Sequence, residues 1–225
     1  MAKPKDQREG DAQFARVLAL AEAAEPAGPP DHSRTRPRPG ITNPRTEPPA
    51  NELRMMKKFR FQLLHRWLTD HVEPCRAADV GGGKGLLAYL LQESGWSTTV
   101  VDPISQTLPD KYKDLTSKRQ IRLGAEEQVP RLDQPFSPEL AQDFDLLIAL
   151  HAHGCNLQMV DAAQEHGADL LLLPCCVIGE PTVPPPGVTW IEWVVQYVLA
   201  RGFQVTPFRL NFKGQNIGIY ARHLG

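Results

Sequence analysis

The chain has 225 residues, 41% of them hydrophobic, which is enough for one packed domain but not comfortably for two. Its longest apolar run, Ala168 to Val177, contains Asp169 and Pro174, so no membrane span is expected, and the N-terminus lacks the apolar core of a secretory signal. Four cysteines do not make a disulfide framework in a chain of this size, and the simplest expectation is a cytoplasmic protein.

The formal net charge of −1 hides a basic strip. Between Arg34 and Arg66, nine Arg and Lys residues face two acids, so this strip carries +7 and the rest of the chain −8. Such a strip is either a footprint for a polyanion or a solvated linker followed by a solvated helix face, and charge alone favours the second interpretation. The basic residues are Arg34, Arg36, Arg38, Arg45, Arg54, Lys57, Lys58, Arg60 and Arg66.

The N-terminal region, residues 1–50, is predicted to be a helix followed by an arm. Residues 11–25 carry apolar side chains at helical spacing, and residues 27–50 contain seven prolines without apolar periodicity, which is typical of an extended linker. Residues 51–225 are predicted to form one domain, which begins with an amphipathic helix over residues 51–71.

Beyond that helix the chain alternates strands and helices. This alternation predicts a doubly wound α/β fold with a mostly parallel sheet, covered by helices on both faces. The last two strands, separated by a short polar turn, predict a C-terminal antiparallel hairpin. The expected strands are residues 76–80, 97–101, 120–124, 145–150, 168–173, 203–210 and 216–222, and the expected helices are residues 85–94, 157–166 and 189–201.

A glycine-rich loop follows the first expected strand. Asp79 near the end of the strand precedes four glycines in five positions, and a helix is expected to begin at Gly85. Glycines allow a sharp turn and a close approach of backbone to ligand at the helix N-terminus. A phosphate-binding P-loop would need Ser or Thr after Lys84, where Gly85 stands, and a dinucleotide loop would need Gly at Leu86.

The loop resembles motif I of class I S-adenosylmethionine-dependent methyltransferases, D/E-x-G-x-G-x-G, with Asp79, Gly81, Gly83 and Gly85 on the pattern. The resemblance implies a Rossmann-like methyltransferase sheet and S-adenosylmethionine as cofactor. It also implies that Asp102, which follows the second strand, holds the ribose hydroxyls, and that Glu126 or Glu127 contacts the adenine. We take Glu126 as the candidate. The alternatives are an NAD-linked oxidoreductase, a catalytically inactive cofactor-binding module, and glycines with a purely structural role.

Polar side chains follow the next two expected strands: His151 and His153 after one, Cys175 and Cys176 after the other. Because the carboxyl ends of neighbouring parallel strands meet at one edge, these residues should lie side by side where ligands bind. His151, His153 and Cys175 are candidate catalytic residues, as a base or as groups that orient the acceptor. They could equally be structural. A metal site is the third and least favoured interpretation, and no metal ligand is assigned, because the spacing matches no common zinc pattern and adjacent cysteines rarely bind one ion.

His-x-x-G together with a later Pro-Cys-Cys resembles one branch of that superfamily. The branch includes tRNA 2′-O-methyltransferases and the methyltransferase-like domain of glutathione-transferase-related proteins, and the resemblance covers about residues 53–181. His153 stands where the branch commonly has Cys. The resemblance implies an RNA acceptor, with tRNA favoured; a protein or a small molecule is the alternative. The residues expected to bind RNA are Arg34, Arg36, Arg38, Lys57, Lys58 and Arg60.

Overall fold

The computed structural model describes residues 5–24 and 56–224 of the chain. The predicted Pro-rich arm, including Arg34, Arg36 and Arg38, lies outside the described residues. Among the helices of the described part, none has the length and hydropathy needed to cross a bilayer.

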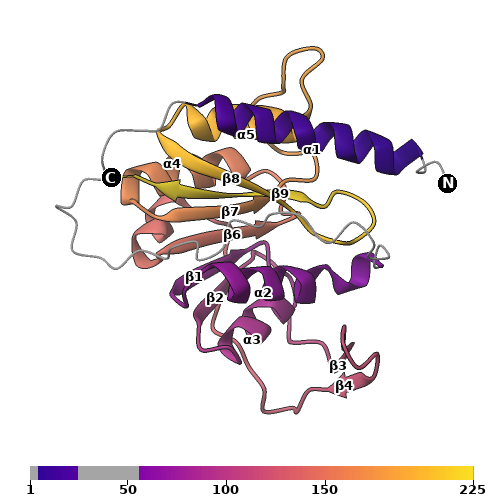
Figure 1. Ribbon diagram of the computed structural model, residues 1–225. Helices are drawn as coiled ribbons and strands as arrows, with labels where there is room; N and C mark the ends of the chain where they lie inside the picture. Colours follow the sequence, from indigo (N-terminus) through magenta and orange to yellow (C-terminus); the bar gives the residue numbers. More distant parts are fainter. Residues whose placement is uncertain (1–4, 25–55, 225) are drawn as a thin grey trace.

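A seven-stranded sheet forms the centre of the domain (Figure 1). In spatial order the strands are β5 (Arg131–Leu132), β2 (Ser97–Val101), β1 (Arg76–Val80), β6 (Leu146–Leu150), β7 (Asp169–Leu173), β9 (Ile217–His223) and β8 (Phe203–Arg209). The first five in this order are parallel, and the last two form an antiparallel hairpin in which β9 pairs with β7. The strand order reverses between β1 and β6, as in other doubly wound folds, so the predicted fold class is confirmed.

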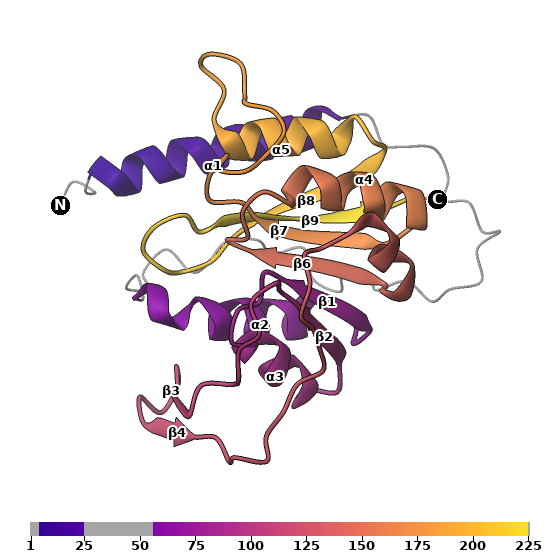
Figure 2. The same ribbon diagram turned by 180° about the vertical axis from the view of Figure 1, so that it is seen from behind.

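Helices cover both faces of the sheet (Figures 1 and 2). Helices α1 (Lys5–Ala23), α4 (Asn156–His166) and α5 (Trp190–Leu199), with the 3₁₀ helix η2 (Pro138–Asp143), lie on one face. Helices α2 (Arg60–His71), which follows the 3₁₀ turn η1 (Lys57–Phe59), and α3 (Leu86–Gln92) lie on the other. All residues of β6 and β7 are buried, because both sides of these strands face a helical layer.

The alternation of side chains along β6 divides the core into two halves. Leu147 and Ala149 pack into the cluster under α4 and α5, whereas Leu146 and Ile148 pack into the cluster under α2 and α3. Since successive side chains of a strand point to opposite faces, a continuous apolar run is what such a strand needs. This is why the short apolar segments were recognisable as strands.

Helix α1 contributes to the first of these clusters. It begins at Lys5 rather than at the expected residue 11, and Phe14 and Val17 are completely buried among residues of α5 and the sheet. Arg16 also forms an ion pair with Glu192 of α5, and Asp11 accepts a hydrogen bond from Arg209 of β8 at 2.6 Å. The N-terminal helix is therefore packed on the domain.

The strand expected at residues 120–124 is not the third strand of the main sheet. Strand β4 (Gln120–Arg122) pairs antiparallel with β3 (Lys111–Lys113) in a separate hairpin, and β5 takes the place beside β2. The reason is composition: β4 is exposed throughout and its one apolar residue, Ile121, remains 38% exposed. Such a segment cannot supply the buried surface that a covered parallel sheet requires, so this prediction was wrong.

Candidate functional site

The glycine-rich loop turns sharply at the carboxyl end of β1. Gly81, Gly83 and Gly85 have φ values of 67°, 56° and 79°, which favour glycine. A Cβ at Gly81 would lie 2.8 Å from the Cβ of Ala152, and one at Gly85 would lie 2.9 Å from Val129. At Gly83 a Cβ would meet nothing nearer than 3.9 Å, so its surface is open for a ligand to approach.

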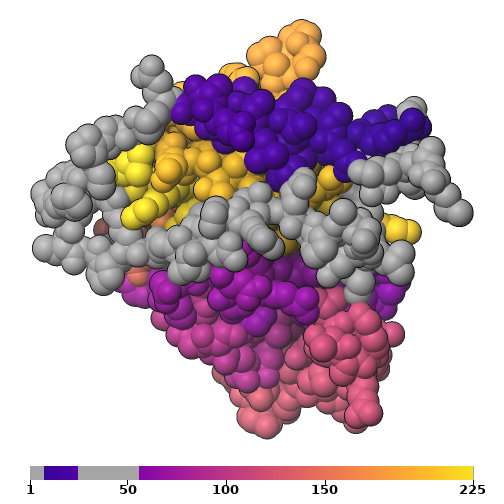
Figure 3. Space-filling model, in the orientation of Figure 1, coloured from indigo at the N-terminus to yellow at the C-terminus, as the bar shows by residue number. Residues whose placement is uncertain are grey.

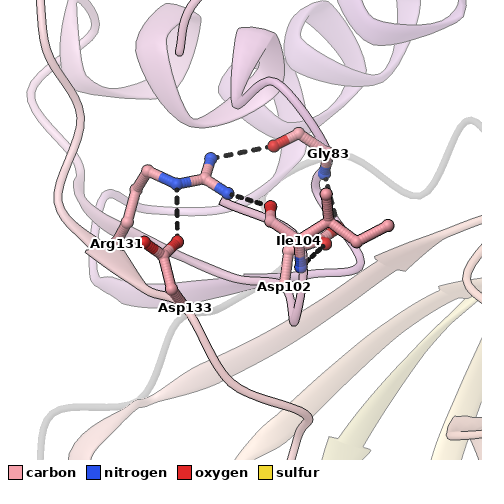
Figure 4. Close-up of polar contacts among 5 residues, drawn as sticks. All are labelled: Gly83, Asp102, Ile104, Arg131 and Asp133. Atoms are coloured by element: carbon pink, nitrogen blue, oxygen red, sulfur yellow. Dashed lines mark hydrogen bonds and ion pairs between the residues drawn. The ribbon is translucent and has the colours of Figure 1, made fainter. Parts of the chain in front are cut away.

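Asp102, which follows β2, reaches across to this loop (Figure 4). One carboxylate oxygen accepts a hydrogen bond from the backbone N–H of Gly83 and the other from that of Ile104, each at 2.9 Å. The residue is only 8% exposed. A carboxylate offers about four acceptor positions, so acceptor capacity remains for two hydroxyl groups.

Arg131 of β5 joins the same two loops from the other side (Figure 4). Its guanidinium donates to the carbonyl oxygens of Gly83, at 2.8 Å, and Ile104, at 3.1 Å, and it pairs with Asp133 at 3.1 Å. Sequence reasoning missed this residue, because β5 has only two residues and no periodic pattern marks it. The loop after β1 and the loop after β2 are thus held together by Asp102 and Arg131.

Asp79, the acid of the motif, is buried beneath the loop. It is 1% exposed, and its Oδ2 has no hydrogen-bond partner among the described residues. Burial raises the pKa of this carboxyl from 3.8 to about 7, although a hydrogen bond from the backbone of Ala88 acts in the opposite direction. This unpartnered buried oxygen can still accept a hydrogen bond.

We expect Asp79→Asn to change how stability depends on pH. Because the folded-state pKa of Asp79 is raised to about 7, its contribution favours folding at low pH and is lost as pH rises from about 4 to about 7. The asparagine variant lacks this loss, so its Tm should fall less than that of the wild type between pH 5 and about pH 8. Thermal unfolding of both proteins across that range measures the difference, and parallel curves would contradict the raised pKa.

A cavity of about 580 Å³ opens between the segment after β2 and the segment between β4 and β5. Its volume is in the range of small-molecule sites. Arg131 lines it, and the side chain of Gln106, another lining residue, is the nearest to the position that a Cβ of Gly83 would take. Glu127 lines this cavity as well, whereas Glu126 lies in the same exposed turn without lining it. A role for Glu126 with the adenine stays a prediction.

His151 lies directly after β6 with a φ of 61°, a conformation uncommon for a residue with a side chain. Its Nε2 donates to the carbonyl oxygen of Gln215, in the turn of the C-terminal hairpin, at 2.7 Å. Burial lowers the pKa of His151 below its ordinary value, and the hydrogen bond to Gln215 only partly opposes this effect. The ring is therefore neutral at pH 7, with Nδ1 as its unprotonated nitrogen.

His153 lies on the other side of the same loop, beside the cysteines after β7. Its Nε2 is 3.1 Å from the Sγ of Cys175, and that sulfur is 3.6 Å from the Sγ of Cys176. Burial, with a smaller effect of Cys176, raises the pKa of Cys175 to about 11, so its thiol is protonated at neutral pH. The side chains of His151 and His153 thus have different partners.

The loops after β6 and β7 are bound to each other. Gly154 and Gly179 both have positive φ, and a Cβ at either position would lie 3.1 Å from backbone atoms of the other. Glu180 accepts hydrogen bonds from the backbone N–H groups of Asn156 and Leu157, at 2.9 and 3.2 Å, at the start of α4. Sequence reasoning missed Glu180, because the helix start that it caps lies 24 residues earlier in the chain and no local capping pattern marks it.

No protein-family model matches the sequence, and no curated protein sequence matches it. Among solved structures, the chain is similar to a ribosomal protein L11 methylase from Lactobacillus delbrueckii subsp. bulgaricus, with 18% identity, a TM-score of 0.47, and 77% of this chain and 82% of that chain covered. It is also similar to human N-acetylserotonin methyltransferase in complex with SAM, with 18% identity, a TM-score of 0.42, and 75% and 52% covered.

A third similar structure is 1,6-didemethyltoxoflavin-N1-methyltransferase from Burkholderia thailandensis, with bound 1,6-didemethyltoxoflavin and S-adenosylhomocysteine. Here the identity is 15%, the TM-score 0.42, and 74% of this chain and 77% of that chain are covered. These identities and TM-scores are too low to transfer a function to this chain.

Proposed function

We propose that this protein is an S-adenosylmethionine-dependent methyltransferase. The observation that carries the proposal is the loop with Gly81, Gly83 and Gly85 held against Asp102 at the switch point of the sheet. Asp102 keeps acceptor capacity for two ribose hydroxyls, and the buried carboxyl of Asp79 lies beneath the same loop. The cofactor would supply a methyl group on a positively charged sulfur, and the protein would bind it and align the acceptor.

Isothermal titration calorimetry of the purified chain tests the cofactor. We expect S-adenosylhomocysteine to bind at micromolar concentration and NAD not to bind. The glycine spacing supports this order, because the position at which a dinucleotide loop needs its third glycine is Leu86, which is buried. Binding of NAD without binding of S-adenosylhomocysteine would overturn the proposal in favour of an oxidoreductase.

His151 is the best candidate for the base that takes a proton from a hydroxyl or amine acceptor. It is neutral at pH 7, and its hydrogen bond to Gln215 leaves Nδ1 as the nitrogen that can accept a proton. His153 and Cys175 lie at the same edge of the sheet and would help to orient the acceptor. The thiol of Cys175 is a poor nucleophile or base, because its raised pKa keeps it protonated.

RNA is the acceptor that the charge distribution favours. Within the described part of the chain, Lys and Arg side chains from the start of α2, including η1, and from the β3–β4 hairpin form one surface, which we call the basic surface. Between Lys111 and Arg122 the hairpin carries five Lys and Arg residues and one acid, and these basic residues are exposed. In Figure 3 the hairpin segment forms a projecting lobe beside the surface of α2 and α3. The residues of the basic surface are Lys57, Lys58, Arg60, Arg66, Lys111, Lys113, Lys118, Arg119 and Arg122.

Specific contacts hold the hairpin next to α2. The buried side chain of Gln62 donates to the carbonyl oxygen of Lys113 at 2.8 Å and accepts from the N–H of Leu115 at 2.6 Å. The Lys118 ammonium lies 5.2 Å from the centre of the Phe59 ring, and the Lys58 ammonium lies 5.4 Å from it. The two parts therefore present their positive charges side by side, which suits the spaced phosphates of a nucleic acid better than a single anion.

The basic surface also extends to the proposed active site. Lys57 and Arg60 are close enough to His151 for their charges to contribute to its lowered pKa, and Lys57 also acts on Cys175. A polyanion bound across this surface would therefore pass beside the loop that carries the proposed base. This placement supports an RNA acceptor over a neutral small molecule.

We expect the double variant Lys57→Glu/Lys58→Glu to bind tRNA more weakly at every sequence tested. Each neutralised phosphate releases condensed counterions, so the slope of log affinity against log salt should also flatten by roughly one to two. Filter binding at several salt concentrations measures both effects. The single variants Lys58→Glu and Arg8→Glu change the charge equally. Arg8→Glu is the control, because Arg8 lies on α1 on the other face of the sheet, so only Lys58→Glu should weaken binding.

The acceptor itself can be identified by adding the purified chain and radioactive S-adenosylmethionine to a lysate that lacks this protein. The label that depends on the added chain is then followed into the RNA, protein and small-molecule fractions. Label in the RNA fraction would support the proposal. Label confined to protein or to small molecules would replace RNA by the alternative acceptor, and no label in any fraction, despite cofactor binding, would favour an inactive cofactor-binding module. Salt-independent or absent tRNA binding would also reject RNA.

A further inference from the structure

The side chains of His153, Cys175 and Cys176 converge at the carboxyl ends of β6 and β7. One potential ligand atom from each lies within 4.8 Å of the others, and no second group of three such residues occurs in the parts of the chain that the structure describes. All three are soft or borderline donors, the chemistry preferred by zinc and related transition metals. We propose that these three residues bind one zinc ion.

The two adjacent cysteines do not diverge as neighbours in a strand would. Strand β7 ends at Leu173, and beyond it the two sulfurs lie 3.6 Å apart. Tetrahedral ligands with zinc–sulfur bonds of about 2.3 Å are separated by roughly 3.7 Å, so this pair already has the required spacing. The usual objection to adjacent cysteines as ligands of one ion therefore does not hold for this backbone.

The third ligand comes from the neighbouring loop, at the right distance for a small movement. His153 Nε2 and Cys175 Sγ are 3.1 Å apart, and a zinc ion between them would need them to separate by only a few tenths of an ångström, to about 3.5 Å. The contact between Gly154 and Gly179 and the hydrogen bonds of Glu180 keep the two loops together. The backbone that carries the three ligands is therefore held in place by surrounding contacts, as a metal site requires.

The geometry leaves one coordination position open. Three protein ligands make an incomplete tetrahedron, and His153 is exposed while both cysteines are half-buried, so an ion can enter and the fourth position can face solvent. Open sites of this kind hold water or substrate at the fourth position. Zinc here would explain how His153 and Cys175 act in orienting the acceptor; in that respect it deepens the proposed function, but its presence does not depend on methyl transfer.

The test uses the full-length chain, purified under reducing conditions without a histidine tag, loaded with zinc and dialysed. We expect inductively coupled plasma mass spectrometry to find about one zinc ion per chain, as for a single specific site. His153→Ala, Cys175→Ser and Cys176→Ser should each lose most of it. Cys75→Ser is the matched control and should keep the zinc. Cys75 lies just before β1, at the edge of the sheet opposite to the carboxyl ends that carry the proposed ligands.

Cobalt serves as a second probe, because it gives a thiolate charge-transfer absorption that should vanish in Cys175→Ser and Cys176→Ser. Circular dichroism and binding of S-adenosylhomocysteine on the same samples show whether each variant is folded, and His153→Ala, at an exposed position, keeps the test decisive if a cysteine variant unfolds. Substoichiometric zinc in the reduced wild type would overturn the proposal, as would equal zinc in all variants. A mass lower by two hydrogens, from a Cys175–Cys176 disulfide, would replace the metal site by a redox pair.

Discussion

His151→Ala is expected to lower the turnover of methyl transfer about a hundredfold, the effect usual for loss of a general base, while cofactor affinity stays nearly unchanged. The reason is that the neutral ring offers Nδ1 as proton acceptor, and alanine offers nothing. Since burial holds the pKa of His151 below 6.5, wild-type activity should persist as pH falls to about that value and decline only below it. Transfer of radioactive methyl groups to RNA from cells lacking this protein measures the turnover.

His166→Ala is the matched control for this substitution. His166 is the last residue of α4, at the far end of that helix from the loop after β6, and its loss should leave turnover unaltered. His153→Ala separates the second histidine from the first. If neither His151→Ala nor His153→Ala reduces turnover, the histidines are structural, and His151 serves only to hold the hairpin turn through Gln215.

Asp102→Ala is expected to weaken binding of S-adenosylhomocysteine tenfold to about a hundredfold. Removing the carboxylate takes away the proposed acceptor of two ribose hydroxyls, a loss of roughly 1–3 kcal/mol. It also leaves the N–H groups of Gly83 and Ile104 without the partner that they have now, so the glycine-rich loop loses part of its support. Calorimetric titration of wild type and variant measures the change.

Asp133→Ala is the control for Asp102→Ala. Asp133 pairs with Arg131 in the same group of contacts but is largely exposed, so its loss should change cofactor affinity only slightly. Asp102→Asn refines the test, because its amide oxygen can still accept one backbone hydrogen bond but cannot accept from both hydroxyls. Wild-type affinity in a folded Asp102→Ala would remove Asp102 from the cofactor site.

The parts of the fold that could be predicted are those with strong local signals. The predicted strands at residues 76–80 and 97–101 coincide with β1 and β2, because runs of small and apolar residues between polar turns mark buried parallel strands. A different pattern misled at residues 120–124, where polar and apolar residues alternate but the strand that forms, β4, stays exposed. Strand β5 was missed because two residues are too few for any period to be visible.

The site divides in the same way. Gly81, Gly83 and Gly85 were recognisable because their backbone conformation requires glycine, and the nearness of His153 to Cys175 could be expected from adjacent strand ends. Arg131, Glu180 and Gln62 were not recognisable. Each acts through hydrogen bonds to backbone groups far away in sequence, and a backbone group leaves no trace in the residue type that carries it.

The fastening of the loops by Asp102 and Arg131 also bears on the kinetics of ligand capture. Ordering the backbone of a loose loop costs about 1–2 kcal/mol per residue, and a binding reaction that must do so is slowed and weakened. Here the segments around Gly83 and Ile104 are already connected before any nucleoside arrives. Association should therefore be a single step whose rate is set by diffusion and orientation. Differences in affinity among related ligands should then come from their dissociation rates.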